Sequence, residues 1–104
     1  MGIFDIFKGG NSFMRGYEDY KAAEGAMLID VRSPKEYAEG HVPGSVNMMA
    51  QELTQLKVAK DTPMFVYCLS GARSARAVTL LEKMGFTNVR NLGGISSYKG
   101  PIEK

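Results

Sequence analysis

The only cysteine of the chain, Cys68, follows an apolar run at residues 64–67 and precedes a short loop. Apolar residues then recur at helical spacing up to Met84. This pattern predicts a buried strand, a tight loop and a helix, with Cys68 at the carboxyl end of the strand. Ligands of open α/β sheets bind at that end, where the N–H groups of the loop converge. The loop consists of Leu69, Ser70, Gly71, Ala72, Arg73 and Ser74.

The surroundings of Cys68 favour a thiolate over a neutral thiol. The loop N–H groups, the positive end of the following helix and the cation of Arg73 all stabilise an anion. A thiolate is the nucleophilic form of cysteine. The alternative is a buried, inert cysteine that behaves as a small hydrophobic residue, the commoner state of a lone cysteine. Its position before a glycine loop and an arginine favours the reactive interpretation. We therefore predict that Cys68 is catalytic and that residues 69–74 bind an anionic substrate.

Two buried strands and a capped helix are predicted to position this loop. Residues 64–68 and 26–32 are mostly apolar without polar alternation, as in strands that are covered on both faces. Ser33 and Glu36 follow the earlier strand with the spacing of a capping box, and a proline occupies the first helical position. Gly40 is expected to end this helix.

The remaining predicted elements alternate between helix and strand. The alternation indicates a parallel sheet with helices on both faces, so the predicted fold class is α/β. We expect a short edge strand at residues 11–14, a helix at 17–24 closed by Gly25, a short strand at 45–48, a short helix at 50–56, a long helix at 74–84 and a last strand at 86–92.

Length and composition restrict the function classes. A chain of 104 residues suits one domain. With 23% charged residues and a net charge of +2, it lacks the basic clusters of nucleic-acid-binding proteins. One cysteine excludes an internal disulfide, and one histidine leaves no metal cluster. We therefore expect no metal, no nucleic-acid partner and a reducing, cytoplasmic location. We also expect a monomer.

The first ten residues are expected to form an N-terminal tail. They contain apolar residues and an aspartate but no basic region, so they do not match a signal peptide. Chain ends are often loose, which favours a short tail. A docking or membrane-contacting turn is the alternative. The predicted organisation is a tail at residues 1–10 and one domain at residues 11–104, without a membrane partner.

Four segments of the chain, in order and at compatible spacing, resemble the single-domain rhodaneses, a family of sulfurtransferases. The resemblance spans residues 17–103. It implies a three-layer rhodanese-like α/β domain whose five-stranded parallel sheet has helices on both faces. It also implies that Cys68 carries a persulfide during turnover and that no cofactor is needed. The four segments are residues 28–37, 40–47, 66–74 and 85–95.

In such an enzyme, Cys68 takes a sulfane sulfur from an anionic donor such as thiosulfate, and cyanide or a thiol then removes it. An acceptor protein is a further partner to consider. Two residues depart from the family pattern. Tyr98 stands where a tryptophan is usual, and we expect this change to concern packing. Leu69 stands where the loop is often polar, and we expect this change to influence the choice of acceptor.

Two other function classes remain open. One is a sulfur-relay or regulatory interaction module of the same fold, and the other is a cysteine-dependent phosphatase or arsenate reductase. Such phosphatases place one more residue between nucleophile and arginine than the four that separate Cys68 from Arg73. A non-catalytic module usually lacks the cysteine, which is present here.

Four further polar residues are not predicted to be catalytic. Asp30 and Arg32 are expected to support the loop through a charge-assisted hydrogen bond. His41 precedes a Pro-Gly turn, and we expect it to stabilise that turn rather than to act as a general base. Arg76 either faces the site or lies on the solvated side of its helix.

Overall fold

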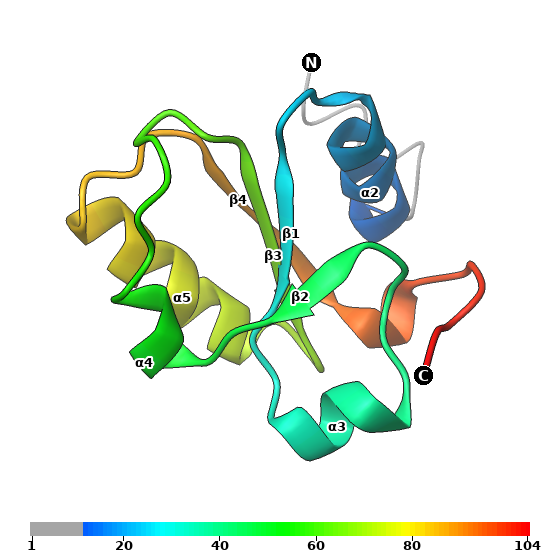
Figure 1. The fold of residues 1–104 in the computed structure, drawn as a ribbon. Coiled ribbons are helices and arrows are strands. Elements are labelled where there is room, and N and C mark those ends of the chain that lie inside the picture. The colour runs from blue at the N-terminus through cyan, green and yellow to red at the C-terminus, as the bar shows by residue number, and fades with distance from the viewer. Residues whose placement is uncertain (1–11) are drawn as a thin grey trace.

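The computed structural model describes residues 12–104 as a four-stranded parallel sheet with helices on both faces (Figure 1). The α/β fold class is confirmed. The strand order is β2-β1-β3-β4. The strands are β1 (Met27–Asp30), β2 (Ser45–Asn47), β3 (Met64–Cys68) and β4 (Val89–Gly94). The helices are α2 (Ser12–Ala22), α3 (Pro34–Glu39), α4 (Ala50–Leu53), α5 (Ala72–Lys83) and the short 3₁₀ helix η1 (Ile95–Ser97).

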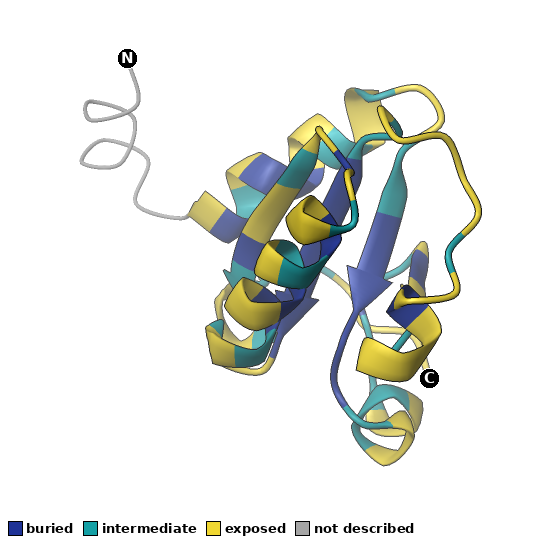
Figure 2. Ribbon diagram, turned by 90° about the vertical axis from the view of Figure 1, so that its left-hand side faces the viewer, coloured by how far each residue is buried: buried dark blue, intermediate teal, exposed yellow. Residues whose placement is uncertain are grey.

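β3 is the central strand of the sheet. It pairs with β1 on one side and β4 on the other, and all five of its residues are buried. Figure 2 shows the buried strands between helices whose outer sides are exposed. A strand that is covered on both faces needs apolar side chains at every position, which explains the unbroken apolar run. The predicted bounds of this strand are confirmed.

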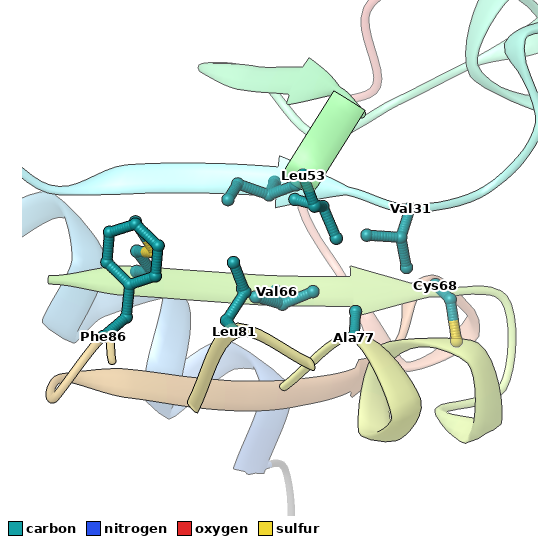
Figure 3. Packing of buried hydrophobic residues seen from close by; sticks show 9 residues of the cluster. Val31, Leu53, Val66, Cys68, Ala77, Leu81 and Phe86 are labelled. Carbon is teal, nitrogen blue, oxygen red and sulfur yellow. The ribbon is translucent and has the colours of Figure 1, made fainter. Parts of the chain in front are cut away.

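Two hydrophobic clusters fill the space between the sheet and its helices. The first lies under α4 and α5 and includes Val66, Cys68 and Leu81 (Figure 3). The second lies under α2 and includes Phe13 and Tyr17. Tyr98 packs edge-on against both of these rings, at centroid distances of 5.9 and 5.4 Å. The residue that replaces the usual tryptophan therefore has the packing role that was expected.

The sheet has four strands within residues 12–104, not the five that the resemblance implied. The segment predicted as an edge strand begins α2 instead, and residue 11 lies outside the described residues. Phe13, Gly16 and Tyr17 recur at helical spacing, and all three are buried. Because a helix places these positions on one face, it covers the sheet with two aromatic rings. Gly16 allows a close approach, since a Cβ there would lie 2.2 Å from Leu92 Cδ2.

Smaller corrections concern the ends of elements. β4 begins at Val89 rather than at residue 86, because Phe86 lies in the turn after α5 and its N–H bonds the carbonyl of Leu81. α4 ends at Leu53, although Leu56 still packs against the first cluster. The predicted tail at residues 1–10 lies outside the described residues. No helix within residues 12–104 has the length and apolar character to cross a membrane.

Candidate active site

The sulfur of Cys68 lies at the carboxyl edge of the sheet and points toward the first turn of α5 (Figure 3). It accepts hydrogen bonds from the backbone N–H groups of Gly71 at 2.9 Å and Ser74 at 3.3 Å. The Ser74 hydroxyl oxygen lies 3.3 Å from the same sulfur. Cys68 is only 1% exposed, so these groups replace water around the sulfur. We call Cys68, Gly71 and Ser74 the sulfur cradle.

The cradle changes the ionisation of the thiol. Burial of Cys68 raises its pKa, because a charged sulfur loses its contact with water. Hydrogen bonds from the Ser74 hydroxyl and from the amides of Ser74, Gly71 and Ser70 act in the opposite direction. Together they lower the pKa of Cys68 below its ordinary value. The thiolate is therefore more populated than in an exposed cysteine, as a nucleophile requires.

Two glycines let the loop close around the sulfur. Gly71, the N-cap of α5, has a φ of 108°, in the left-handed region that side chains disfavour. Gly94 lies against the loop, where a Cβ would be 2.3 Å from the carbonyl oxygen of Leu69. The end of β4 and the loop therefore touch backbone to backbone, and this contact fixes the loop on the sheet.

The Ser74 hydroxyl also joins the sulfur to β4. It lies 2.7 Å from Oδ1 of Asn91 and 3.0 Å from the carbonyl oxygen of Gly71. The N–H of Gly93 donates to the same Oδ1 at 2.8 Å. Asn91 was not predicted as a site residue, because 17 positions separate it from Ser74. The sequence did show that Asn91 is a polar residue near the carboxyl end of the last predicted strand. In the structure this strand, β4, lies next to the central strand β3.

Arg73 was predicted to bind the substrate, and its guanidinium is held by Glu36. Its two terminal nitrogens donate to the two carboxylate oxygens at 2.8 and 3.1 Å. Glu36 also accepts from the backbone N–H of Ser33 at 2.9 Å, within the predicted capping box of α3. The hydrogen bonds from Arg73, followed by the Ser33 amide, lower the pKa of Glu36 to about 2. The cap of α3 was predictable from the spacing of Ser33 and Glu36, but its contact with Arg73 was not.

The other predicted loop residues have different environments. Leu69, Ser70 and Ala72 are exposed at the mouth of the site, and Leu69 is 48% exposed. The amide of Ser70 is the smallest of the contributions that lower the pKa of Cys68. All six residues after Cys68 therefore lie at one edge of the sheet, although only Gly71 and Ser74 bond directly to the sulfur in this structure.

Asp30 and Arg32 form a buried ion pair, so their role is structural, as predicted. Their side-chain hydrogen bonds join them to each other and to the end of α3, however, and not to the loop after Cys68 that they were expected to support. Arg32 donates to Asp30 Oδ2 at 2.6 Å and to the carbonyl of Gly40 at 2.7 Å, so it ties β1 to the end of α3. His41 Nδ1 lies 2.9 Å from the carbonyl oxygen of Tyr37, and its ring stacks on Tyr37 at 3.7 Å. The side chain of His41 therefore contacts the last turn of α3, and not the Pro-Gly turn that it was expected to stabilise.

A hollow of about 380 Å³ lies beside the loop, between α4 and α5. Its walls are mostly apolar, and Arg76, whose orientation the sequence left open, lines it together with Arg73. This volume is within the range of small-molecule sites. Residues 12–104 contain no group of three side chains suited to hold a metal ion. The lining residues are Val31, Met49, Ala50, Leu53, Arg73, Arg76, Ala77 and Leu80.

Comparison with known proteins identifies the family. Residues 14–100 match the family model described as a Rhodanese-like domain. The chain belongs to this family. The rhodanese-like domain is 39% identical over 90 residues to the uncharacterized protein YqhL of Bacillus subtilis, covering 83% of this chain and 71% of that protein. It is 36% identical over 81 residues to the thiosulfate sulfurtransferase PspE of Escherichia coli, covering 73% of this chain and 77% of that protein.

The solved structures agree with this assignment. The structure described as rhodanese with anions from E. coli superposes on the rhodanese-like domain with a TM-score of 0.66 at 33% identity. The match covers 76% of this chain and 98% of that one. A rhodanese-related protein from Thermoplasma volcanium gives a TM-score of 0.71 at 31% identity, and the match covers 88% of this chain and 93% of that one. The predicted family is therefore confirmed, and several of the relatives, PspE among them, are named as sulfurtransferases.

Proposed function

We propose that this domain is a thiosulfate sulfurtransferase that passes a sulfane sulfur from an anionic donor to a thiol or cyanide through a persulfide on Cys68. The observation that supports it most directly is the sulfur cradle, in which Gly71 and Ser74 bond to the sulfur of Cys68. The name of PspE, a thiosulfate sulfurtransferase, supports the same class of donor.

In the first half-reaction, the Cys68 thiolate attacks the outer sulfur of thiosulfate. A new S–S bond forms to Cys68 while the S–S bond within thiosulfate breaks, and sulfite leaves with its electron pair. The outer sulfur of the persulfide then carries the negative charge. Because the loop amides converge on this region, they stabilise an anion both before and after the transfer.

In the second half-reaction, a thiolate or cyanide attacks the outer sulfur of the persulfide. The bond between the two sulfurs breaks, and its electron pair returns to Cys68 as a thiolate. Every charge in the cycle resides on sulfur, on sulfite or on the acceptor, so the proposed reaction needs no cofactor. The site returns to its starting state, ready for another donor.

An acceptor protein is the second candidate partner, and the exposed Leu69 favours it. This apolar side chain lies at the mouth of the site, 48% exposed, where a docking protein could cover it. The Adenylyltransferase and sulfurtransferase uba4 of Ogataea parapolymorpha is 32% identical over 90 residues, although the match covers only 23% of that protein. Its name indicates that it combines sulfur transfer with a second activity.

Intact-mass measurement tests the proposed function. Incubation with excess thiosulfate should add one sulfur atom, and cyanide should remove it with release of thiocyanate. Cys68→Ser should show neither step, whereas Ser70→Ala, which keeps the backbone amide at an exposed position, should show both. An unchanged mass after thiosulfate would overturn the donor assignment. Hydrolysis of p-nitrophenyl phosphate that depends on Cys68 would support the phosphatase alternative instead.

A further inference from the structure

The Ser74 hydroxyl has one proton and three possible acceptors. The Oδ1 of Asn91 lies at 2.7 Å, the carbonyl oxygen of Gly71 at 3.0 Å and the sulfur of Cys68 at 3.3 Å. A hydroxyl donates one hydrogen bond and accepts up to two. Ser74 is fully buried, so water does not supply a further donor at this point. The three acceptors therefore compete for a single proton.

The backbone of Gly93 fixes which atom of the Asn91 amide faces Ser74. Its N–H donates to Oδ1 at 2.8 Å, and the Nδ2 group lies 3.5 Å from the carbonyl oxygen of Gly71. Reversing the amide would place its NH₂ group against the N–H of Gly93 and remove both contacts. Oδ1 is therefore the atom that faces Ser74, and it can only accept.

Two proton arrangements follow from this geometry. When Cys68 is a thiol, its S–H can donate to the Ser74 oxygen while Ser74 donates to Asn91. When Cys68 is a thiolate, Ser74 must turn its proton to the sulfur and give up its bond to Asn91. We propose that Asn91 is a positioning residue that competes with Cys68 for the proton of Ser74 and so limits how readily the thiol ionises.

This competition also bears on sulfur transfer, in a step that rests on the proposed function. In the persulfide, the negative charge lies on the outer sulfur, and the inner sulfur is a weak acceptor. The proton of Ser74 can then return to Asn91 without leaving a charged sulfur unpaired. No covalent bond changes in this step, because only the hydroxyl rotates. Asn91 therefore favours the loaded form of the enzyme over the free thiolate.

The charged groups around the loop do not compete in the same way. Arg73 on α5 is paired with Glu36 on α3, and Arg32 is paired with Asp30 at the end of β1. Asn91 carries no charge, so its effect passes through the hydroxyl of Ser74. This gives the proposal a distinctive expectation, because replacing Asn91 should matter only while Ser74 is present.

The rate at which iodoacetamide alkylates Cys68, measured across pH, tests this proposal without any sulfur donor. Asn91→Leu keeps the approximate shape of this exposed side chain but removes the acceptor. We expect it to lower the pH midpoint of alkylation by about 0.5–1 unit, the effect of one competing hydrogen bond. Asn91→Asp keeps an acceptor and adds a negative charge, and it should raise the midpoint. Asn88→Ala, just before β4, should leave it unchanged.

Combined variants separate competition from a general loss of structure. Ser74→Ala should raise the midpoint, and Asn91→Leu should then cause no additional shift in the Ser74→Ala background. A damaged cradle would raise the midpoint in Asn91→Leu, which is the opposite sign. Either that result or an equal shift in both backgrounds would overturn the proposal. Because alkylation reports only ionisation, failure of the proposed sulfur transfer would show separately, as an unchanged mass after thiosulfate.

Discussion

Arg73 and Glu36 meet through two parallel hydrogen bonds, at 2.8 and 3.1 Å, so the positive charge beside the cradle is already balanced. Removing the arginine alone deletes the guanidinium and its N–H donors and also leaves the Glu36 carboxylate unpaired beside the site. We expect Arg73→Ala to slow loading by thiosulfate by about ten- to a hundred-fold, through loss of a charge-assisted contact and repulsion of the donor. The rate of mass increase measures this effect.

A double variant separates the two causes. Arg73→Ala combined with Glu36→Gln removes the arginine without leaving a negative charge, so it should load faster than Arg73→Ala alone. Equal rates in the two variants would show that repulsion by Glu36 plays no part. Thermal melts of both variants check that the change lies in the site rather than in folding.

Gly94 is required because of its contact and not because of its own backbone angles. Its φ of −105° suits any residue, but a Cβ would lie 2.3 Å from the Leu69 carbonyl oxygen. Gly94→Ala should therefore displace the loop, abolish most loading and cost ~1–3 kcal/mol of stability, as overpacking does. Gly93→Ala is the matched control, because it strains the backbone at φ 101° but meets nothing within 4 Å. Similar loading by both variants would contradict this account.

At the scale of elements, α3 depends on its cap, since none of its six residues is buried. Arg73 and the Ser33 amide lower the pKa of Glu36 from 4.5 to about 2 in the folded protein. A carboxyl group whose pKa is lowered by folding stabilises the folded protein at pH values above its pKa in the unfolded chain. This stabilisation is lost as the pH falls through the pKa of the group in the folded protein. Melting temperatures measured from about pH 5 to pH 2 should therefore fall less steeply in Glu36→Gln than in the wild type. Glu39→Gln, on the same helix, should follow the wild type.

Local sequence patterns were enough to predict two kinds of element. One is a strand that is buried on both faces of the sheet, and the other is a helix start whose cap contacts its own neighbours in sequence. The bounds of β3 and the cap of α3 match their predictions, because each depends on a short run of residues. The start of α2 was missed, because burial of Phe13 and Tyr17 against the sheet decides it. A short amphipathic segment becomes a helix or a strand according to the surface it covers.

The contacts that complete the site were hidden for a different reason. Asn91 reaches Ser74 because β4 lies beside β3 with a register shift, in which Val66 pairs with Asn91 and Tyr67 with Gly93. Such a bulge changes which side chains face a site, and spacing along the chain does not reveal it. The pairing of Arg73 with Glu36 likewise spans 37 positions. The nucleophile and its loop were predictable, whereas these partners depend on how distant segments meet.

For the whole molecule, the central strand determines whether the domain folds. Val66 is fully buried between β1 and β4, in the first hydrophobic cluster. Val66→Asp would bury a carboxylate without a partner, at a cost of several kcal/mol. Because a domain of this size is stable by only ~5–15 kcal/mol, we expect this variant to be largely unfolded at room temperature. A cooperative melt near that of the wild type, followed by circular dichroism, would contradict the strand assignment.

The balanced ion pairs around the loop also determine how a donor arrives from solution. The chain has a net charge of only +2, and both Arg73 and Arg32 are neutralised by neighbouring carboxylates. Raising salt from about 0.01 M to about 0.15 M shortens the screening length from ~30 Å to ~8 Å. The second-order loading rate should nevertheless change by less than about threefold, because little long-range attraction exists to be screened. A steep fall with ionic strength would show that the protein steers the anion from a distance. Without such steering, the proposed donor would reach Cys68 by unguided diffusion and would be recognised only on contact.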